Sequence, residues 1–182
     1  LMRTGTADAR LNVVNGQTST PAISVVDITG EGSLRIFFRP GTATDLAGND
    51  VGTPGTAFIH VDQTAPTFTI SAPNPSSTSN SEVTYTVDYT GADQYNIDQN
   101  SFTISATGTA DADVNVRSVI NDSVVVTLTN ISGDGEITLN AVAGTASDLA
   151  GNTASAGSSS TALVVDNTAP VVALSDSMTT QT

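Results

Sequence analysis

The stretch Glu-Val-Thr-Tyr-Thr-Val-Asp-Tyr, residues 82–89, decides the fold class, because polar and apolar residues alternate along it. Successive side chains of a β-strand point to opposite faces of the sheet. A period of two therefore predicts a strand that is buried on one side only. The residues expected on the buried side are Val83, Tyr85, Val87 and Tyr89.

Short apolar runs of the same kind occur on both sides of this stretch, and Gly, Asn, Asp and Ser separate them as turns require. No segment shows the 3.6-residue period of an amphipathic helix. These runs predict an all-β protein, an antiparallel β-sandwich of about seven short strands in each hundred residues. The runs cover residues 23–28, 34–38, 59–61, 68–70, 102–104, 114–116, 123–131, 136–141 and 161–166.

The chain also repeats itself. Thr-Gly-Thr-Ala-Asp-Ala occurs at residues 4–9 and again at 107–112, an offset of 103. Later blocks keep this offset or exceed it by one residue, so the repeating unit has about 104 residues, a common domain size. We expect residues 1–62 to be the C-terminal part of one unit, 63–166 a complete unit, and 167–182 the first strand of a following unit.

This division leaves the first unit without counterparts of residues 63–103. The tail of another copy would supply only the counterparts of residues 63–78. Simple strand exchange between identical chains therefore falls about 25 residues short, a count that follows from the repeat. We expect upstream sequence or a partner to complete the first unit, because its apolar face is otherwise open.

Composition excludes several functions. The 182 residues contain no Cys, so disulfides, thiolate zinc sites and cysteine nucleophiles are ruled out. The five cationic residues are all Arg, and the formal net charge is −13. Nucleic-acid binding is not expected, because it needs clustered positive charge. The apolar runs are too short for a membrane-spanning helix, so membrane insertion is not expected either.

Two repeated acidic blocks are candidates for chemistry. The first is Asp-Leu-Ala-Gly-Asn, at residues 45–49 and 148–152. Asp and Gly are typical of tight turns, and the turn interpretation is compatible with a second one, in which Asp45 and Asp148 are ligands of calcium. The second block is Val-Asp-x-Thr-Ala-Pro, at residues 61–66 and 165–170. Here Asp62 and Asp166 are either calcium ligands at a domain junction or solvated linker carboxylates.

Together, these motifs resemble the tandem immunoglobulin-like repeats of very large bacterial surface adhesins and biofilm-associated proteins. The resemblance extends over all three whole or partial units. It implies an extracellular or cell-surface location and a spacer role in which the repeats project a distal adhesive region. It also implies calcium at the junctions as the one candidate cofactor, bound by acidic residues there.

Other residues carry weaker hypotheses. The single histidine, His60, corresponds to Val164 and is expected to be structural. Asp111 and Asp113 are close in sequence, but Asp113 corresponds to Arg10, which argues against a paired-carboxylate hydrolase. We therefore predict no enzymatic activity. The partners expected are neighbouring repeats of the same chain. Two alternatives remain: an extracellular filament subunit held by β-strand complementation between copies, and a glycan- or protein-binding module.

Overall fold

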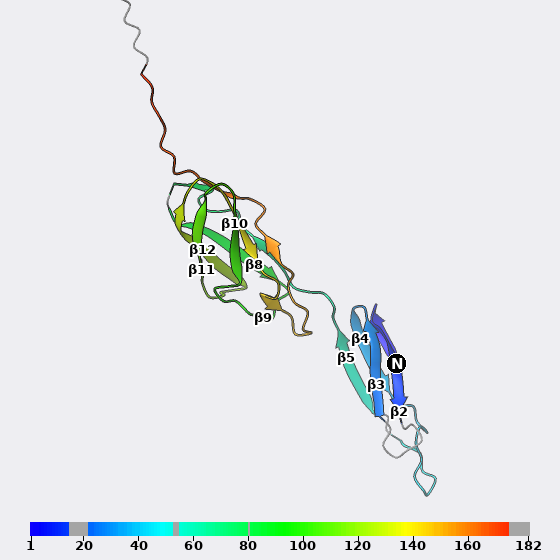
Figure 1. Ribbon diagram of the computed structural model, residues 1–182. Coiled ribbons are helices and arrows are strands. Elements are labelled where there is room, and N and C mark those ends of the chain that lie inside the picture. Colours follow the sequence, from blue (N-terminus) through cyan, green and yellow to red (C-terminus); the bar gives the residue numbers. More distant parts are fainter. Residues whose placement is uncertain (15–21, 53–54, 80, 175–182) are drawn as a thin grey trace, which may run out of the picture. The chain divides into compact units, whose positions relative to one another are not determined.

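The computed structural model describes residues 1–14, 22–52, 55–79 and 81–174, and the regular structure of these residues is entirely β-strand (Figure 1). The prediction of an all-β protein is confirmed. Within the described residues, no helix is long and apolar enough to cross a membrane. The chain forms two compact units. The first contains Leu1–Ala65 and Asp148–Asn152, and the second contains Pro66–Ser147 and Thr153–Thr182.

The strands of the first unit form two antiparallel sheets. One has the order β1-β4-β5, and the other contains β2 and β3 alone. The buried cluster of this unit is small and consists of Ala7, Ala9, Leu34 and Val61. The strands are β1 (Met2–Gly5), β2 (Asp8–Val14), β3 (Ala22–Thr29), β4 (Gly32–Phe37) and β5 (Thr56–Val61).

The second unit has two larger sheets. One is antiparallel with the order β11-β12-β8-β6, and the other has the order β10-β13-β16-β7, with β15 added beside β13. The pairing of β7 with β16 is parallel. A two-stranded sheet of β9 and β14 completes the unit. The strands are β6 (Thr67–Ile70), β7 (Ser77–Thr78), β8 (Val83–Thr90), β9 (Gln94–Tyr95), β10 (Phe102–Ala106), β11 (Asp111–Val116), β12 (Ser123–Ser132), β13 (Gly135–Ala141), β14 (Ala146–Ser147), β15 (Gly157–Ser158) and β16 (Leu163–Val165).

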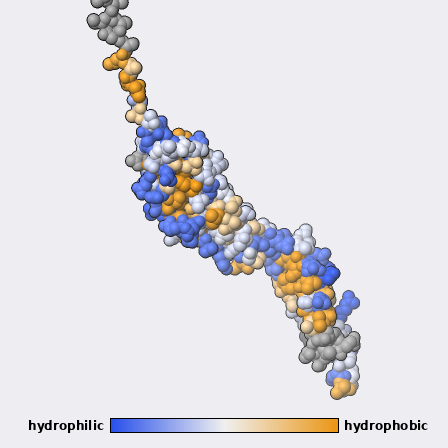
Figure 2. Space-filling model, viewed as in Figure 1, coloured by the Kyte–Doolittle hydropathy of each residue, from blue (hydrophilic) through white to orange (hydrophobic). Residues whose placement is uncertain are grey.

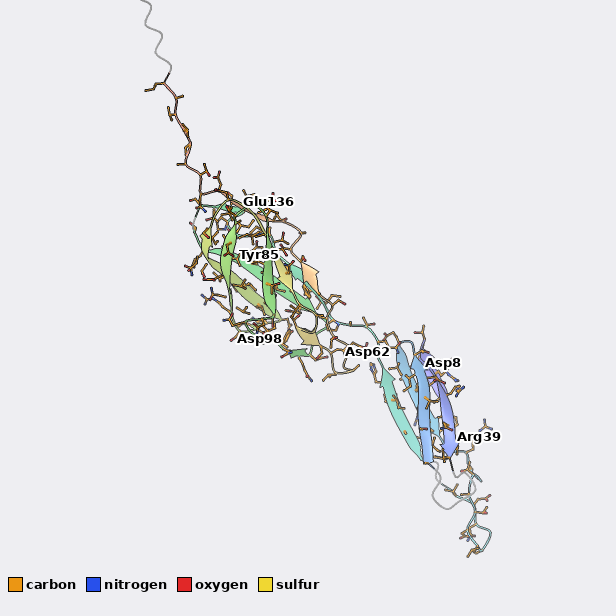
Figure 3. The ribbon with its side chains drawn as sticks, viewed as in Figure 1. Asp8, Arg39, Asp62, Tyr85, Asp98 and Glu136 are labelled. Atoms are coloured by element: carbon orange, nitrogen blue, oxygen red, sulfur yellow. The ribbon has the colours of Figure 1, made fainter. Side chains whose placement is uncertain are left out.

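Strand β8 lies in the middle of its sheet and carries the predicted alternation. Its four predicted inward residues are all buried, whereas Asp88 on the other face is exposed. Its pairing with β12 runs without a break from Ser123 opposite Asp88 to Leu128 opposite Val83. Figure 3 shows Tyr85 among the strands of this unit.

The core of the second unit combines side chains from both larger sheets. The buried faces of β12 and β13 are the ones that the sequence predicts. They belong to one cluster with β8, β10 and β16. Full burial of one such aliphatic side chain contributes about 1.5–3 kcal/mol. The β12 and β13 residues are Val124, Val126, Leu128, Ile137, Leu139 and Ala141.

The pairing of β2 with β3 recurs, residue for residue, in the pairing of β11 with β12. Asp8 lies opposite Thr29, and Asp111 lies opposite Ser132, 103 residues further on. Both ladders then shift register at the next pair. Such a shift is a β-bulge, in which one strand carries an extra residue.

The two bulges share a backbone conformation but not a charge pattern. Asp27 has a φ of 55°, and the corresponding Asn130 has a φ of 52°. In the first unit Arg10 Nε lies 3.0 Å from Asp27 Oδ2. In the second, Asn130 Nδ2 donates to Asp113 Oδ2 at 2.7 Å. The carboxylate thus lies on β3 in the first unit and on β11 in the second, and in both units a side-chain contact joins the two strands at the bulge.

The hydroxyl of Tyr85 gives the first testable prediction. It is buried without a hydrogen-bond partner among the described residues, and burial raises the pKa of Tyr85 to about 12. Removing an unsatisfied buried hydroxyl costs no hydrogen bond, so Tyr85→Phe should change the free energy of unfolding by less than about 1 kcal/mol, or raise it.

Tyr95→Phe is the matched control, because Tyr95 Oη donates to Asp122 Oδ1 at 2.6 Å. Loss of a hydrogen bond to a charged acceptor should cost about 1–2 kcal/mol. Urea titrations followed by tyrosine fluorescence measure both variants, since all three tyrosines lie in the second unit. A Tyr85→Phe variant less stable than Tyr95→Phe would contradict this packing.

Candidate functional site

Each unit contains an acidic turn between two glycines. The turn Gly30-Glu31-Gly32 joins β3 to β4, and Gly133-Asp134-Gly135 joins β12 to β13. The glycines have positive φ and lie against a neighbouring strand end. A Cβ atom built on Gly30 would lie 2.1 Å from the Thr6 carbonyl oxygen, and one on Gly133 would lie 1.9 Å from that of Thr109. Only glycine fits so close to another backbone.

Threonine hydroxyls fix the backbone of the acidic residue. The amide of Glu31 donates to Thr6 Oγ1 at 3.0 Å, and the amide of Thr6 donates to the Glu31 carbonyl at 2.8 Å. In the second unit, Asp134 and Thr109 make the same two bonds at 3.0 and 2.9 Å. The Thr-Gly-Thr part of the repeat thus positions the acidic side chain.

In the first unit, the side chain of Glu31 holds the segment that follows β5. Glu31 Oε1 accepts hydrogen bonds from the amide of Gln63 at 2.8 Å and from Thr64 Oγ1 at 2.9 Å. The side chain of Gln63 makes two further hydrogen bonds to the backbone. Its Oε1 accepts from the amide of Gly30 at 3.2 Å, and its Nε2 donates to the carbonyl of Ile28 at 3.3 Å. We call the acidic residue and the two residues it holds the exit clamp.

The second unit has the same exit clamp after β16. Asp134 Oδ1 accepts from the amide of Asn167 at 2.6 Å, and its Oδ2 accepts from Thr168 Oγ1 at 3.2 Å. The side chain of Asn167 donates to the Gly133 carbonyl at 2.6 Å. Glutamate is replaced by the shorter aspartate, yet the same backbone amide and the same threonine hydroxyl are bound.

The junction residues Asp62 and Asp166 lie next to the clamps, but the acidic turn residues hold the chain. Asp62 Oδ1 accepts from the amide of Thr64 at 3.0 Å, and Asp166 Oδ1 accepts from that of Thr168 at 3.0 Å. This is an Asx turn, which stiffens three residues of backbone. Figure 3 shows Asp62 just after β5.

Asp45 and Asp148 each close a turn. Asp45 Oδ1 accepts from the amides of Ala47 and Asn49 at 2.9 Å, and its Oδ2 accepts from Asn49 Nδ2 at 2.9 Å. Asp148 bonds in the same way to the amide and side chain of Asn152, at 2.9 and 2.8 Å. The hydrogen bond from the asparagine side chain is the largest cause that lowers the pKa of each aspartate.

The turn interpretation of residues 45–49 and 148–152 is therefore what the hydrogen bonds support, and calcium binding stays a prediction. Within the described ranges, no group of three or more acidic or histidine side chains is placed to hold a metal ion. Inside the first compact unit, Asn152 Nδ2 also donates to the Asp62 carbonyl at 3.0 Å.

The weaker candidates occupy ordinary strand positions. His60 is exposed on β5, opposite Ser33. Asp113 accepts a hydrogen bond from its strand neighbour Asn130. Tyr89 is buried, and the Tyr95 hydroxyl is bound by Asp122. Tyr89 is therefore not available to stack against a sugar ring.

Sequence reasoning missed Glu31 and Asp134 as the central residues of the site. The signal was present, because both lie at the same place in a repeated Gly-acid-Gly block. The contact with residues 63–64 and 167–168 spans more than 30 positions, so the sequence alone does not show it. Comparison with protein-family models, with curated proteins and with solved structures gives no match.

The glycine contacts give a second prediction. Gly133→Ala should lower the free energy of unfolding by more than about 3 kcal/mol, because it adds a backbone clash to left-handed strain. The control is Gly144→Ala, since Gly144 also lies in the second unit and has a φ of 81°, but no neighbouring atom lies within 4 Å of the place where its Cβ would be. It should cost only about 1–2 kcal/mol. Equal losses in tyrosine-monitored urea unfolding would contradict the turn geometry.

The lowered pKa of Asp148 gives a third prediction. The ionised carboxylate of Asp148 stabilises the folded state. This stabilisation is fully present above the ordinary pKa of 3.8 and is lost as the pH falls through the lowered pKa of Asp148 in the folded state. The native chain should thus exceed Asp148→Asn in stability at about pH 6, and the difference should shrink at about pH 3. Tyrosine-monitored urea midpoints at both pH values measure it.

The turn of Asp148 connects Ser147 to Thr153, which pair with each other in the second unit, so tyrosine fluorescence reports on it. Asp45→Asn, whose turn connects Thr44 to Asp50 of the first unit, is the control that should leave the midpoints unchanged; a pH-independent Asp148→Asn difference would refute the assignment.

Proposed function

We propose that this chain is a stretch of structural spacer repeats from a rod-like extracellular surface protein, whose repeats project a distal adhesive region. The proposal includes the finer architecture: each unit is an immunoglobulin-like β-sandwich, whole or partial, and the units are tandem repeats. The repeated motifs support it, since head-to-tail arrays gain their stability from each unit and from contacts with its neighbours.

The observation that carries the proposal is the exit clamp, which occurs twice with the same chemistry. In each unit a turn carboxylate binds the backbone and the threonine side chain of the segment that leaves the last strand. A spacer must control the direction in which the chain leaves each unit. A binding module or an enzyme has no comparable need to repeat this feature at every unit.

Proline residues also restrict the direction in which the chain leaves each unit. Each clamped threonine lies two residues before a proline, Pro66 or Pro170. Proline fixes its own φ and favours an extended conformation in the residue before it. The Asx turn, the clamp and the proline together leave few freely rotating bonds in the five residues after β5. Resistance to bending thus arises from hydrogen bonds and sterics within the chain.

The acidic composition suits an array on a cell surface. A net charge of −13 over 182 residues makes neighbouring copies repel each other and keeps them soluble. Calcium at Asp45, Asp62, Asp148 or Asp166 remains a part of the proposal that the exit clamp does not require. At Asp45 and Asp148 both carboxylate oxygens already accept N–H donors, and at Asp62 and Asp166 the Oδ1 atom does.

The rival filament hypothesis requires one copy to complete another. The exposed segment Val171–Leu174 repeats the sequence position of β6, residues 67–70. In the second unit β6 pairs with β8 and not with β12. A tail strand from another copy would therefore need a counterpart of β8 to pair with. Residues 1–65 do not contain such a counterpart. This favours the spacer over the filament.

The fourth prediction tests the clamp. The chain has no cysteine, so Asn12→Cys and Thr103→Cys provide one spin label in each unit, and pulsed electron paramagnetic resonance gives the distribution of distances between them. The distribution should be narrow. Glu31→Ala removes two hydrogen bonds, worth about 1–3 kcal/mol together, and should at least roughly double its width.

Asp134→Ala is the matched control, because it breaks the same bonds in the segment after β16 and leaves the residue 62–66 connection intact. It should not change the distance distribution. A broad distribution in the native chain, or equal effects of the two variants, would reject the spacer proposal.

A further inference from the structure

The strand β3 has a free edge. Within the part of the chain that the structure describes, β3 pairs with β2 only, whereas the equivalent β12 pairs with β11 on one side and β8 on the other. Among the described residues, no strand lies beside the backbone groups of β3 that face away from β2. A free edge of this kind is a template for another strand.

The apolar face beside this edge is open as well. Leu11 and Val13 of β2 are 40% and 53% exposed, whereas their equivalents on β11 are half-buried. Phe38 is 41% exposed, but the corresponding Ala141 is 3% exposed. Figure 2 shows hydrophobic surface over the strands of the first unit.

The second unit shows what fills the equivalent place. There β8 lies beside β12 and places four apolar side chains in the core. Ile23 and Val25 of β3 correspond to Val126 and Leu128, which lie opposite Tyr85 and Val83. The β2–β3 pair and the β11–β12 pair share their register and their bulge. The edge of β3 therefore offers the same surface that β12 offers to β8.

From this equivalence, we infer that the edge of β3 and the open face beside it form an acceptor site for an extended segment of the β8 type, with Val or Tyr at alternate positions. The segment adds antiparallel to β3 and inserts its apolar side chains against Ile23 and Val25. Backbone hydrogen bonds give affinity and the alternate side chains give specificity, as in other strand additions. The inference rests on the recurring strand register and not on the spacer role.

The amides that face the free edge come from alternate residues of β3. Tyr89 N donates to the Asp122 carbonyl, so alternation along the ladder makes the amides of Val126 and Leu128 donors to β8. We therefore expect the equivalent Ile23 and Val25 to supply the main backbone bonds to the added segment.

The fifth prediction uses the full 182-residue chain and a fluorescent peptide with the sequence of residues 81–91. The control peptide has the same composition, but each Val or Tyr is exchanged with the polar residue that follows it. This exchange moves the apolar set to the other face. The first peptide should raise fluorescence anisotropy on binding and slow amide exchange in residues 22–29, with no change in residues 125–132. The control should bind at least about tenfold more weakly.

Two variants define the site. Val25→Asp should weaken binding at least about tenfold, because it places a charge on the apolar face. Phe58→Asp is the control, since Phe58 is 69% exposed on β5 and should leave the affinity unchanged.

Three results would overturn the inference. The first is the absence of protection in residues 22–29 with the β8 peptide, and the second is equal affinity for the phase-exchanged peptide. The third is a dimer of the peptide-free chain that Val25→Asp dissociates, because the occupant of the edge would then be a second copy. Sedimentation over a range of concentrations measures this last outcome.

Discussion

The pairing of β8 with β12 is the interaction on which the closed unit depends. It supplies six consecutive registered residue pairs and places Val83, Tyr85, Val87 and Tyr89 in the buried cluster to which both larger sheets contribute. Among the described residues of the first unit no such central strand is present, and the buried cluster there consists of two alanines, one leucine and one valine. The same turns and bulges form in both units, so local sequence specifies them, whereas core closure requires the central strand.

The two acidic turns have a different role, because they determine how the chain leaves each unit. Glycines at positive φ bring the turn against the Thr-Gly-Thr backbone, and the threonine hydroxyl then orients the acidic residue. The carboxylate in turn binds residues 63–64 or 167–168. Three sequence motifs that are far apart in the chain thus form one structural feature. This explains why they recur together, at offsets of 103 or 104 residues.

Much of the fold could be predicted from the sequence, because the period of two identifies buried strand faces directly. The inward residues of β8, β12 and β13 are those that alternation predicts. The two-residue strands β7, β9, β14 and β15 could not be found, since two residues show no period. The turn role of Asp45 and Asp148 followed from local chemistry. The clamping role of Glu31 and Asp134 did not, because their partners lie more than 30 residues away.

Residue-resolved amide exchange in the native chain tests most directly whether β8 closes the unit. The amides of Val126 and Leu128 face β8, and those of the equivalent Ile23 and Val25 face an open edge. We expect exchange at least about a hundredfold slower at Val126 and Leu128, because opening there requires loss of a central strand pairing. Equal protection of the two pairs of amides would mean that β3 is already covered, and would contradict the closing role of β8.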